Sequence, residues 1–227
     1  MARKNKQLVL FSIFILLSIV YVKAQSSDSA KSVHAIYSTD FSKDALGKFP
    51  QNWVSNRPGE IVIQKNLLGK WLKMHAQGTY LPKLDKELPK NFTISFDFIH
   101  QAIGNGNNTT EITLFSKSDS VVNDALFPGS RGVKIILETF IVSCLCYDNQ
   151  NQANKPSAEY RSKIIQANHL AKVSIKVEGQ LLSVSVNGFE CIRIPVCLSD
   201  KQAINAMRFY LWGSQAEPLI SNLKIYQ

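Results

Sequence analysis

Residues Ala171–Pro195, AKVSIKVEGQLLSVSVNGFECIRIP, carry the pattern that decides the fold. Apolar and polar residues alternate from Val173 to Val177, as they do in a strand with one buried and one solvated face. The same alternation resumes after Gly179 and continues to Asn187-Gly188, the dipeptide best suited to a two-residue type I′ turn. The stretch therefore predicts three antiparallel strands joined by two tight turns.

The second of these turns also predicts how side chains pair across the hairpin. If Asn187-Gly188 forms the turn, Val186 lies opposite Phe189 and Val184 lies opposite Cys191. An antiparallel sheet built from such hairpins can have one face in water, and the polar residues of the alternating pattern would lie on that face.

A second regular segment, Asn91–Ile99, shows that this sheet needs a facing layer. Four large apolar side chains share one face of it: Phe92, Ile94, Phe96 and Phe98. Each contributes roughly 1.5–3 kcal/mol when fully buried. A single exposed sheet cannot bury them, so the sequence predicts an all-β, two-sheet antiparallel β-sandwich.

Other short segments extend the same architecture over the chain. We expect a first strand near Tyr37 to lie beside the last strand near Ile225, as in a jelly roll. The nearly continuous apolar run of residues 133–147 is rich in β-branched residues, and we read it as one long strand or a strand with a bend. The Gly- and Pro-containing stretch of residues 46–53 reads as a loop.

The N-terminus has the composition of a secretory signal peptide. Basic residues precede an apolar run from Leu8 to Val22, and Ala24 ends a short cleavage-compatible stretch. We expect residues 1–24 to be cleaved, residues 25–32 to form a flexible leader and residues 33–227 to form the sandwich domain. An uncleaved anchor is the alternative, but the run is shorter than the ~20 residues of a usual spanning helix. The expected location is secreted or periplasmic, with no membrane span after cleavage.

The charge of the chain argues against a nucleic-acid partner. The formal net charge is +9, and residues 1–24 contain four basic residues and no acidic ones, so cleavage lowers it to +5. The remaining basic residues are scattered along the chain rather than gathered in one run, which is typical of a solvated surface.

Short motifs that define strands and turns are spread over almost the whole chain. They are Asp40-Phe41-Ser42 with Gly47, Phe49, Pro50 and Trp53; residues 69–73; Tyr80-Leu81-Pro82; Leu88-Pro89; residues 91–94; Val186-Asn187-Gly188; residues 209–213; and residues 220–223. Together they resemble the concanavalin A-like, laminin G-like (LamG-like) jelly-roll domain of exported Bacteroidetes proteins, often found before an OmpA-type domain. The resemblance covers residues 36–226 and implies a fold, not a reaction.

Five aromatic residues are the candidates for carbohydrate binding, because flat rings stack on pyranose rings. They are Trp53, Trp71, Tyr80, Tyr210 and Trp212. The alternative for each is a structural role within or over the sandwich.

No catalytic or metal-binding pattern is present. Concanavalin A-like glucanases place carboxylates at alternate positions of one strand, whereas Glu111, Glu138 and Glu178 stand alone on separate predicted strands and Asp85 and Glu87 lie in a turn. The four histidines have no metal-ligand spacing. We therefore predict no catalytic residue, metal or cofactor, although the polar loops of residues 104–111 and 148–155 could carry calcium ligands.

The four cysteines leave two interpretations open. Cys144, Cys146, Cys191 and Cys197 could include a disulfide in an exported protein, or could be buried thiols that act as small apolar residues. A bridge between Cys144 and Cys146 is disfavoured, because both project from the same face of one strand.

These observations favour an exported, non-catalytic β-sandwich module that binds carbohydrate or another cell-envelope component, on a sheet face or on the loops at one rim. Two alternatives remain. One is a glycoside-processing enzyme, which two carboxylates about 5–9 Å apart in a cleft would support. The other is a structural or assembly protein of the envelope whose partner is another protein.

Overall fold

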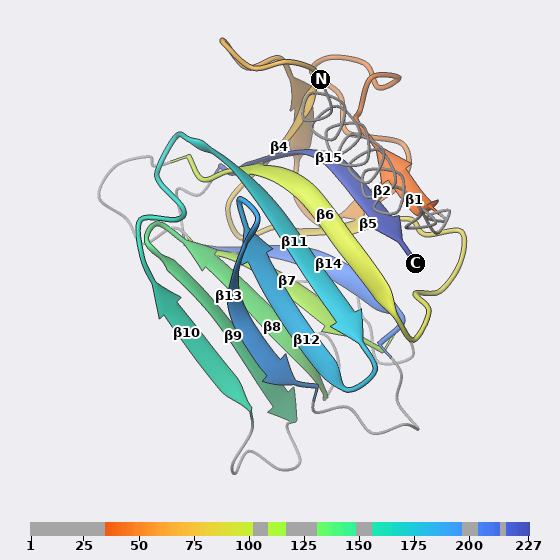
Figure 1. The fold of residues 1–227 in the computed structure, drawn as a ribbon. Coiled ribbons are helices and arrows are strands. Elements are labelled where there is room, and N and C mark those ends of the chain that lie inside the picture. The colour runs from red at the N-terminus through yellow and green to blue at the C-terminus, as the bar shows by residue number, and fades with distance from the viewer. Residues whose placement is uncertain (1–34, 102–108, 117–130, 149–155, 197–203, 214–216) are drawn as a thin grey trace, which may run out of the picture. The chain divides into compact units, whose positions relative to one another are not determined.

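The computed structural model describes residues 35–101, 109–116, 131–148, 156–196, 204–213 and 217–227. All of them belong to the unit His34–Gln227. These residues form fifteen β-strands, arranged in two antiparallel sheets that face each other (Figure 1). The prediction of an all-β, two-sheet sandwich is confirmed.

The first sheet has eight strands in the order β13-β12-β11-β6-β15-β4-β3, with β1 also paired to β15. Their bounds are β1 Ala35–Thr39, β3 Gly59–Val62, β4 Trp71–Met74, β6 Phe92–Ile99, β11 Leu170–Glu178, β12 Leu181–Val186, β13 Phe189–Pro195 and β15 Leu219–Tyr226.

The second sheet has seven strands in the order β10-β9-β8-β7-β14-β5-β2. Their bounds are β2 Trp53–Ser55, β5 Thr79–Pro82, β7 Thr109–Phe115, β8 Arg131–Glu138, β9 Ile141–Asp148, β10 Ser157–Arg161 and β14 Ala206–Trp212.

The predicted meander forms β11, β12 and β13. Asn187 and Gly188 have φ values of 53° and 81°, the left-handed conformations that a type I′ turn requires. Val186 pairs with Phe189 as predicted, but the prediction for Val184 is wrong, because its partner is Ile192 and not Cys191. A β-bulge at this point adds one residue to β13 and shifts the register.

The core lies between the two sheets. The predicted row on β6 is buried, and the ring of Phe96 meets that of Phe209 on β14 edge to face, with centroids 5.4 Å apart. This contact joins the two layers directly, because β6 and β14 belong to different sheets. The facing layer that the sequence required is therefore present.

Residues 133–147 differ from the prediction of one long strand or a strand with a bend. They lie in β8 and β9, which pair with each other around a turn at Thr139-Phe140, where Phe140 has a φ of 68°. The apolar run is continuous because both faces of these strands are largely covered, so no polar alternation marks the reversal.

The ends of the sandwich match the prediction in part. Tyr37 on β1 pairs with Ile225 on β15, which confirms that the first and last strands are neighbours. The predicted loop of residues 46–53 runs into the short strand β2, which the sequence did not reveal. The signal peptide and the leader lie outside the described residues.

Candidate functional site

The outer face of the seven-stranded sheet carries an unusual set of polar side chains. Inward-facing core residues alternate with outward-facing ones along β7, β8 and β14, so Glu111, Lys134 and Arg208 all point away from the core. Thr113 on β7 pairs with Lys134 on one side and Arg208 on the other. We call Glu111, Thr113, Lys134, Arg208 and Trp212 the sheet-face cluster.

Glu111 is the centre of this cluster. Its carboxylate accepts a hydrogen bond from Thr113 Oγ1 at 2.7 Å and one from Trp212 Nε1 at 3.1 Å. Lys134 Nζ lies 3.5 Å from Glu111 Oε2. Three different strands therefore converge on one carboxylate, which is only 1% exposed.

The two cations of the cluster lie against aromatic rings. Lys134 Nζ is 5.3 Å from the ring centroid of Tyr147, and Arg208 Cζ is 5.4 Å from that of Tyr210. Burial lowers the pKa of Lys134 and of Arg208, and the charge of Glu111 acts in the opposite direction on both. The cations are desolvated and depend on Glu111 for part of their compensation.

Gly132 allows this arrangement. It pairs with Tyr147 across β8 and β9, and a Cβ at this position would lie 2.6 Å from both Tyr147 Oη and Leu114 O. Glycine therefore leaves the space in which the Tyr147 ring lies across the sheet beside Lys134.

Buried charges on a sheet face cost stability unless they are compensated. Sites that bind or transform a ligand are a common place for such charges, and the outer face of a sandwich needs none of them for folding. Trp212 is half-buried, so its ring reaches the surface while its N–H is bound to Glu111. The cluster is therefore our principal candidate site.

The five aromatic candidates separate into two groups. The rings of Trp53, Trp71 and Tyr80 are buried and leave no open face for stacking on a sugar. Tyr210 and Trp212 lie together on the outer face, perpendicular to each other with centroids 5.1 Å apart. Of the five, only Trp212 is more than slightly exposed.

The charged members of the cluster were missed by sequence reasoning. Glu111 was read as an isolated carboxylate, because the neighbours of β7 in the sheet cannot be inferred from spacing along the chain. The available signal was a charged residue in the interior of each of two strongly apolar strands, Glu111 in TTEITLF and Lys134 in RGVKIILE.

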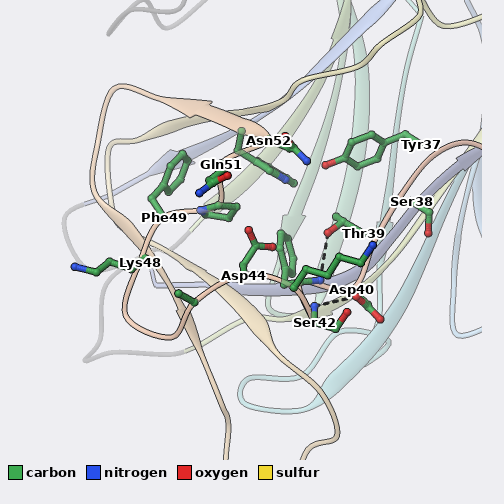
Figure 2. Close-up of a pocket in the computed structure, with 15 residues that line it drawn as sticks. Tyr37, Ser38, Thr39, Asp40, Ser42, Asp44, Lys48, Phe49, Gln51 and Asn52 are labelled. Atoms are coloured by element: carbon green, nitrogen blue, oxygen red, sulfur yellow. Dashed lines mark hydrogen bonds between the residues drawn. The ribbon is translucent and has the colours of Figure 1, made fainter.

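A separate pocket lies between β1 and β2 and has a volume of about 500 Å³. The residues lining it run from Tyr37 to Trp53, and most are polar (Figure 2). Trp53 Nε1 and Tyr37 Oη are buried, and neither has a hydrogen-bond partner. This pocket contains none of the residues of the sheet-face cluster.

The cysteines take both of the states considered. Cys146 is disulfide-bonded, whereas Cys144 and Cys191 are free thiols. Burial, helped by the nearby Cys191, raises the pKa of Cys144 to about 12, so this thiol stays protonated and packs as an apolar side chain. Cys197 lies outside the described residues.

The described residues contain no group of three or more His, Cys, Asp or Glu side chains placed to hold a metal ion. The polar stretches of residues 104–111 and 148–155 fall largely outside the described ranges. The described part of the chain also contains no apolar helix of membrane-spanning length.

Comparisons with solved structures reveal close likeness in fold at low sequence identity. The carbohydrate recognition domain of Emp47p superposes with a TM-score of 0.63 at 14% identity, over 88% of this chain and 99% of that chain. The exoplasmic/lumenal domain of VIP36, bound to Ca²⁺ and Man3GlcNAc, gives 0.59 at 12% identity, over 86% and 90%. Carbohydrate-binding module CBM66 from Bacillus subtilis gives 0.51 at 14% identity, over 78% and 96%.

A comparison with protein-family models finds no match, and neither does a comparison with curated proteins. The structural likeness shows that the chain has the concanavalin A-like fold of these domains. The fold expectation that came from the motif resemblance is thereby confirmed.

Proposed function

We propose that this protein is an exported, non-catalytic module that binds carbohydrate on the outer face of its seven-stranded sheet. The likeness in fold to carbohydrate recognition domains and to a carbohydrate-binding module supports this class of function. Because a fold hosts many functions, the proposal depends on the site.

The half-buried indole of Trp212, held by Glu111, is the observation that carries the proposal. The bond between Trp212 Nε1 and the carboxylate fixes the ring, so little side-chain entropy is lost when a sugar stacks on it. Glu138, also half-buried on this face, accepts a hydrogen bond from Thr109 Oγ1 at 2.6 Å and offers a second oxygen for sugar hydroxyls. An aromatic ring beside carboxylates suits a neutral glycan.

A glycan array probed with the wild type and with Trp212→Ala tests the proposal. Phe189→Ala is the matched control, because Phe189 is a 52%-exposed aromatic residue on the other sheet. We expect the wild type and the control to bind the same glycans and Trp212→Ala to lose most of that signal. Equal binding by all three proteins, or no binding to any glycan or to purified cell wall, would refute the proposal.

We further propose that residues 1–24 are a signal peptide, that the source is a member of the Bacteroidetes, and that the mature protein is secreted or periplasmic. The basic and apolar composition of the N-terminus supports export. Mass spectrometry of the mature N-terminus after expression in a bacterial host tests this: we expect Gln25 to be the first residue, and an intact Met1 in a membrane fraction would contradict it.

One observation favours the alternative of a glycoside-processing enzyme. Glu111 on β7 pairs with Ile136 on β8. Glu138, two residues further along β8, is therefore the diagonal neighbour of Glu111 on the same face of the sheet. The backbone positions of diagonal neighbours on adjacent strands are about 7–8 Å apart, so two glutamate side chains placed in this way can reach opposite sides of one glycosidic bond. Hydrolysis of glycans that bind on the array, abolished in both Glu111→Gln and Glu138→Gln, would establish catalysis.

A further inference from the structure

We propose that the pocket between β1 and β2 is a second binding site, and that it takes a neutral sugar ring or similar polyol through hydrogen bonds to Trp53 and Tyr37. This site goes beyond the proposed function, because it shares no residue with the sheet-face cluster. A protein with both sites would hold a glycan at two places.

Two polar groups in this pocket lack partners. Trp53 is 3% exposed, and its indole N–H donates no hydrogen bond. Tyr37 Oη is also buried without a partner. Buried donors are nearly always satisfied in folded proteins, so an unsatisfied pair at one pocket points to a ligand oxygen that completes them.

The tyrosine stays neutral in this setting. Burial raises the pKa of Tyr37 to about 12, and the charges of Asp44 and Asp85 add to this rise, while the Trp53 N–H partly offsets it without reaching hydrogen-bond geometry. At neutral pH, Tyr37 is therefore a hydroxyl that can donate or accept. A sugar hydroxyl can do the same, so the two groups are complementary.

The charge of the pocket selects a neutral ligand. Two carboxylates, Asp40 and Asp44, and two ammonium groups, Lys43 and Lys48, line it, so their formal charges cancel. In Figure 2 the Tyr37 hydroxyl points toward Asn52, and Asp44 borders the same hollow. A ligand hydroxyl that accepts from the indole can thus donate to a carboxylate or amide oxygen, and the volume of about 500 Å³ is ordinary for a small-molecule site.

The loop that forms the pocket is held in place by hydrogen bonds within the protein. Lys70 Nζ donates to Ser42 O at 2.9 Å and to Asp44 O at 2.6 Å. Further along the loop, Gly47 N donates to Ile61 O at 2.8 Å, and Ile61 N donates to Lys48 O at 2.9 Å. A pre-formed pocket binds with less loss of conformational entropy than one that must close around its ligand.

Indole N–H resonances in ¹H–¹⁵N NMR spectra test this site directly. The chain has three tryptophans, Trp53, Trp71 and Trp212, so Trp71→Phe and Trp212→Phe assign all three signals while leaving Trp53 in the core. The probes are methyl α-D-mannopyranoside, methyl β-D-galactopyranoside and glycerol, with sodium galacturonate as a charged comparison. We expect at least one neutral probe to shift the Trp53 signal in a saturable manner and the Trp71 signal to stay in place.

Tyr37→Phe supplies the specific test, with Tyr160→Phe on β10 as the matched control. Loss of one hydrogen bond should weaken the titrated affinity about 3–10-fold in Tyr37→Phe and leave it unchanged in Tyr160→Phe. The proposal fails if no neutral probe moves the Trp53 signal, if galacturonate binds as well as the neutral probes, or if Tyr37→Phe binds like the wild type.

The same spectra separate this proposal from the function assigned to the sheet face. Binding at the sheet-face cluster would move the Trp212 signal and would be lost in Trp212→Ala, whatever happens at Trp53. A shift at Trp53 that persists in Trp212→Ala supports the second site, and a shift at Trp53 that disappears with Trp212→Ala contradicts it.

Discussion

The two sheets use their outer faces in different ways. On the eight-stranded sheet, Lys172, Lys176 and Glu178 of β11 are exposed, and the pair between Lys176 and Glu178, at 2.7 Å, is open to water. On the seven-stranded sheet, Glu111 and Arg208 are each only 1% exposed. The first face is what a half-buried strand pattern predicts, whereas the second requires charges to be removed from water.

This difference indicates that the outer face of the seven-stranded sheet keeps charges that folding does not require. Exposed ion pairs contribute little to stability, so the outer face of the eight-stranded sheet is nearly neutral for folding. Buried charges cost desolvation energy that apolar residues of similar size would avoid. A face that keeps them is the place to look for a ligand.

Replacing Glu111 should have the largest effect on stability. Glu111→Ala removes the acceptor of two hydrogen bonds and leaves Lys134 without its carboxylate, and breaking a buried pair in this way costs about 3–5 kcal/mol. Glu178→Ala, the matched change on the other sheet, should cost about 1 kcal/mol or less. Urea unfolding monitored by tryptophan fluorescence measures both.

A second variant sharpens this comparison. Adding Lys134→Met to Glu111→Ala removes the uncompensated ammonium, so the double variant should regain part of the lost stability. If Glu111→Ala and Glu178→Ala lower the free energy of unfolding by the same small amount, the distinction between the two faces is contradicted.

Gly132→Ala should have an intermediate effect. The added Cβ would meet a backbone carbonyl oxygen, Leu114 O, which cannot move aside as a flexible side chain could. Overpacking of this kind costs about 1–3 kcal/mol, whereas Ser174→Ala on the eight-stranded sheet should stay within about 0.5 kcal/mol. Thermal or urea unfolding measures the difference, and a Gly132→Ala variant as stable as Ser174→Ala would contradict the packing described for Tyr147.

The same contrast explains which strands and turns could be predicted from the sequence. The meander of β11 to β13 was predicted because each strand has a wet face, which leaves an alternating pattern, and because Asn187-Gly188 defines its turn. Residues 133–147 lack that pattern because they are covered on both faces, so the turn at Phe140 was missed. The sheet-face cluster could not be predicted, because the adjacency of Glu111, Lys134 and Arg208 depends on the order of the strands.

The aromatic candidates show a related limit. Sequence composition selected Trp53, Trp71, Tyr80, Tyr210 and Trp212 together, but their exposure depends on which face of which strand each one occupies. Trp53 also shows that a buried ring can line a pocket, which no periodicity in the sequence indicates.

Acidification should have a smaller effect, centred on the buried histidine of the eight-stranded sheet. His100 follows β6, and burial lowers its pKa below 6.5, with the charge of Glu138 acting in the opposite direction. Below pH 6.5 the histidine therefore binds a proton more readily in the unfolded chain than in the folded one. The contribution of His100 to the free energy of unfolding is fully present above pH 6.5 and falls as the pH drops toward the folded-state pKa. The contribution has a slope of at most about 1.4 kcal/mol per pH unit.

Urea unfolding at pH 7.5 and pH 5.5 measures this contribution. His100→Phe should lose less stability on acidification than the wild type, and His169→Gln, which alters an exposed histidine, should behave as the wild type does. An identical loss in all three proteins would assign the pH dependence to other groups.

The most direct test of the account is a map of backbone amide shifts during titration with the oligosaccharide that gives the strongest signal on the glycan array. Binding on the outer face of the seven-stranded sheet predicts that the largest shifts fall on β7, β8 and β14, around Glu111, Lys134 and Trp212, and that β11 and β12 remain unchanged. Shifts confined to β11 and β12, on the solvated face of the other sheet, would contradict it.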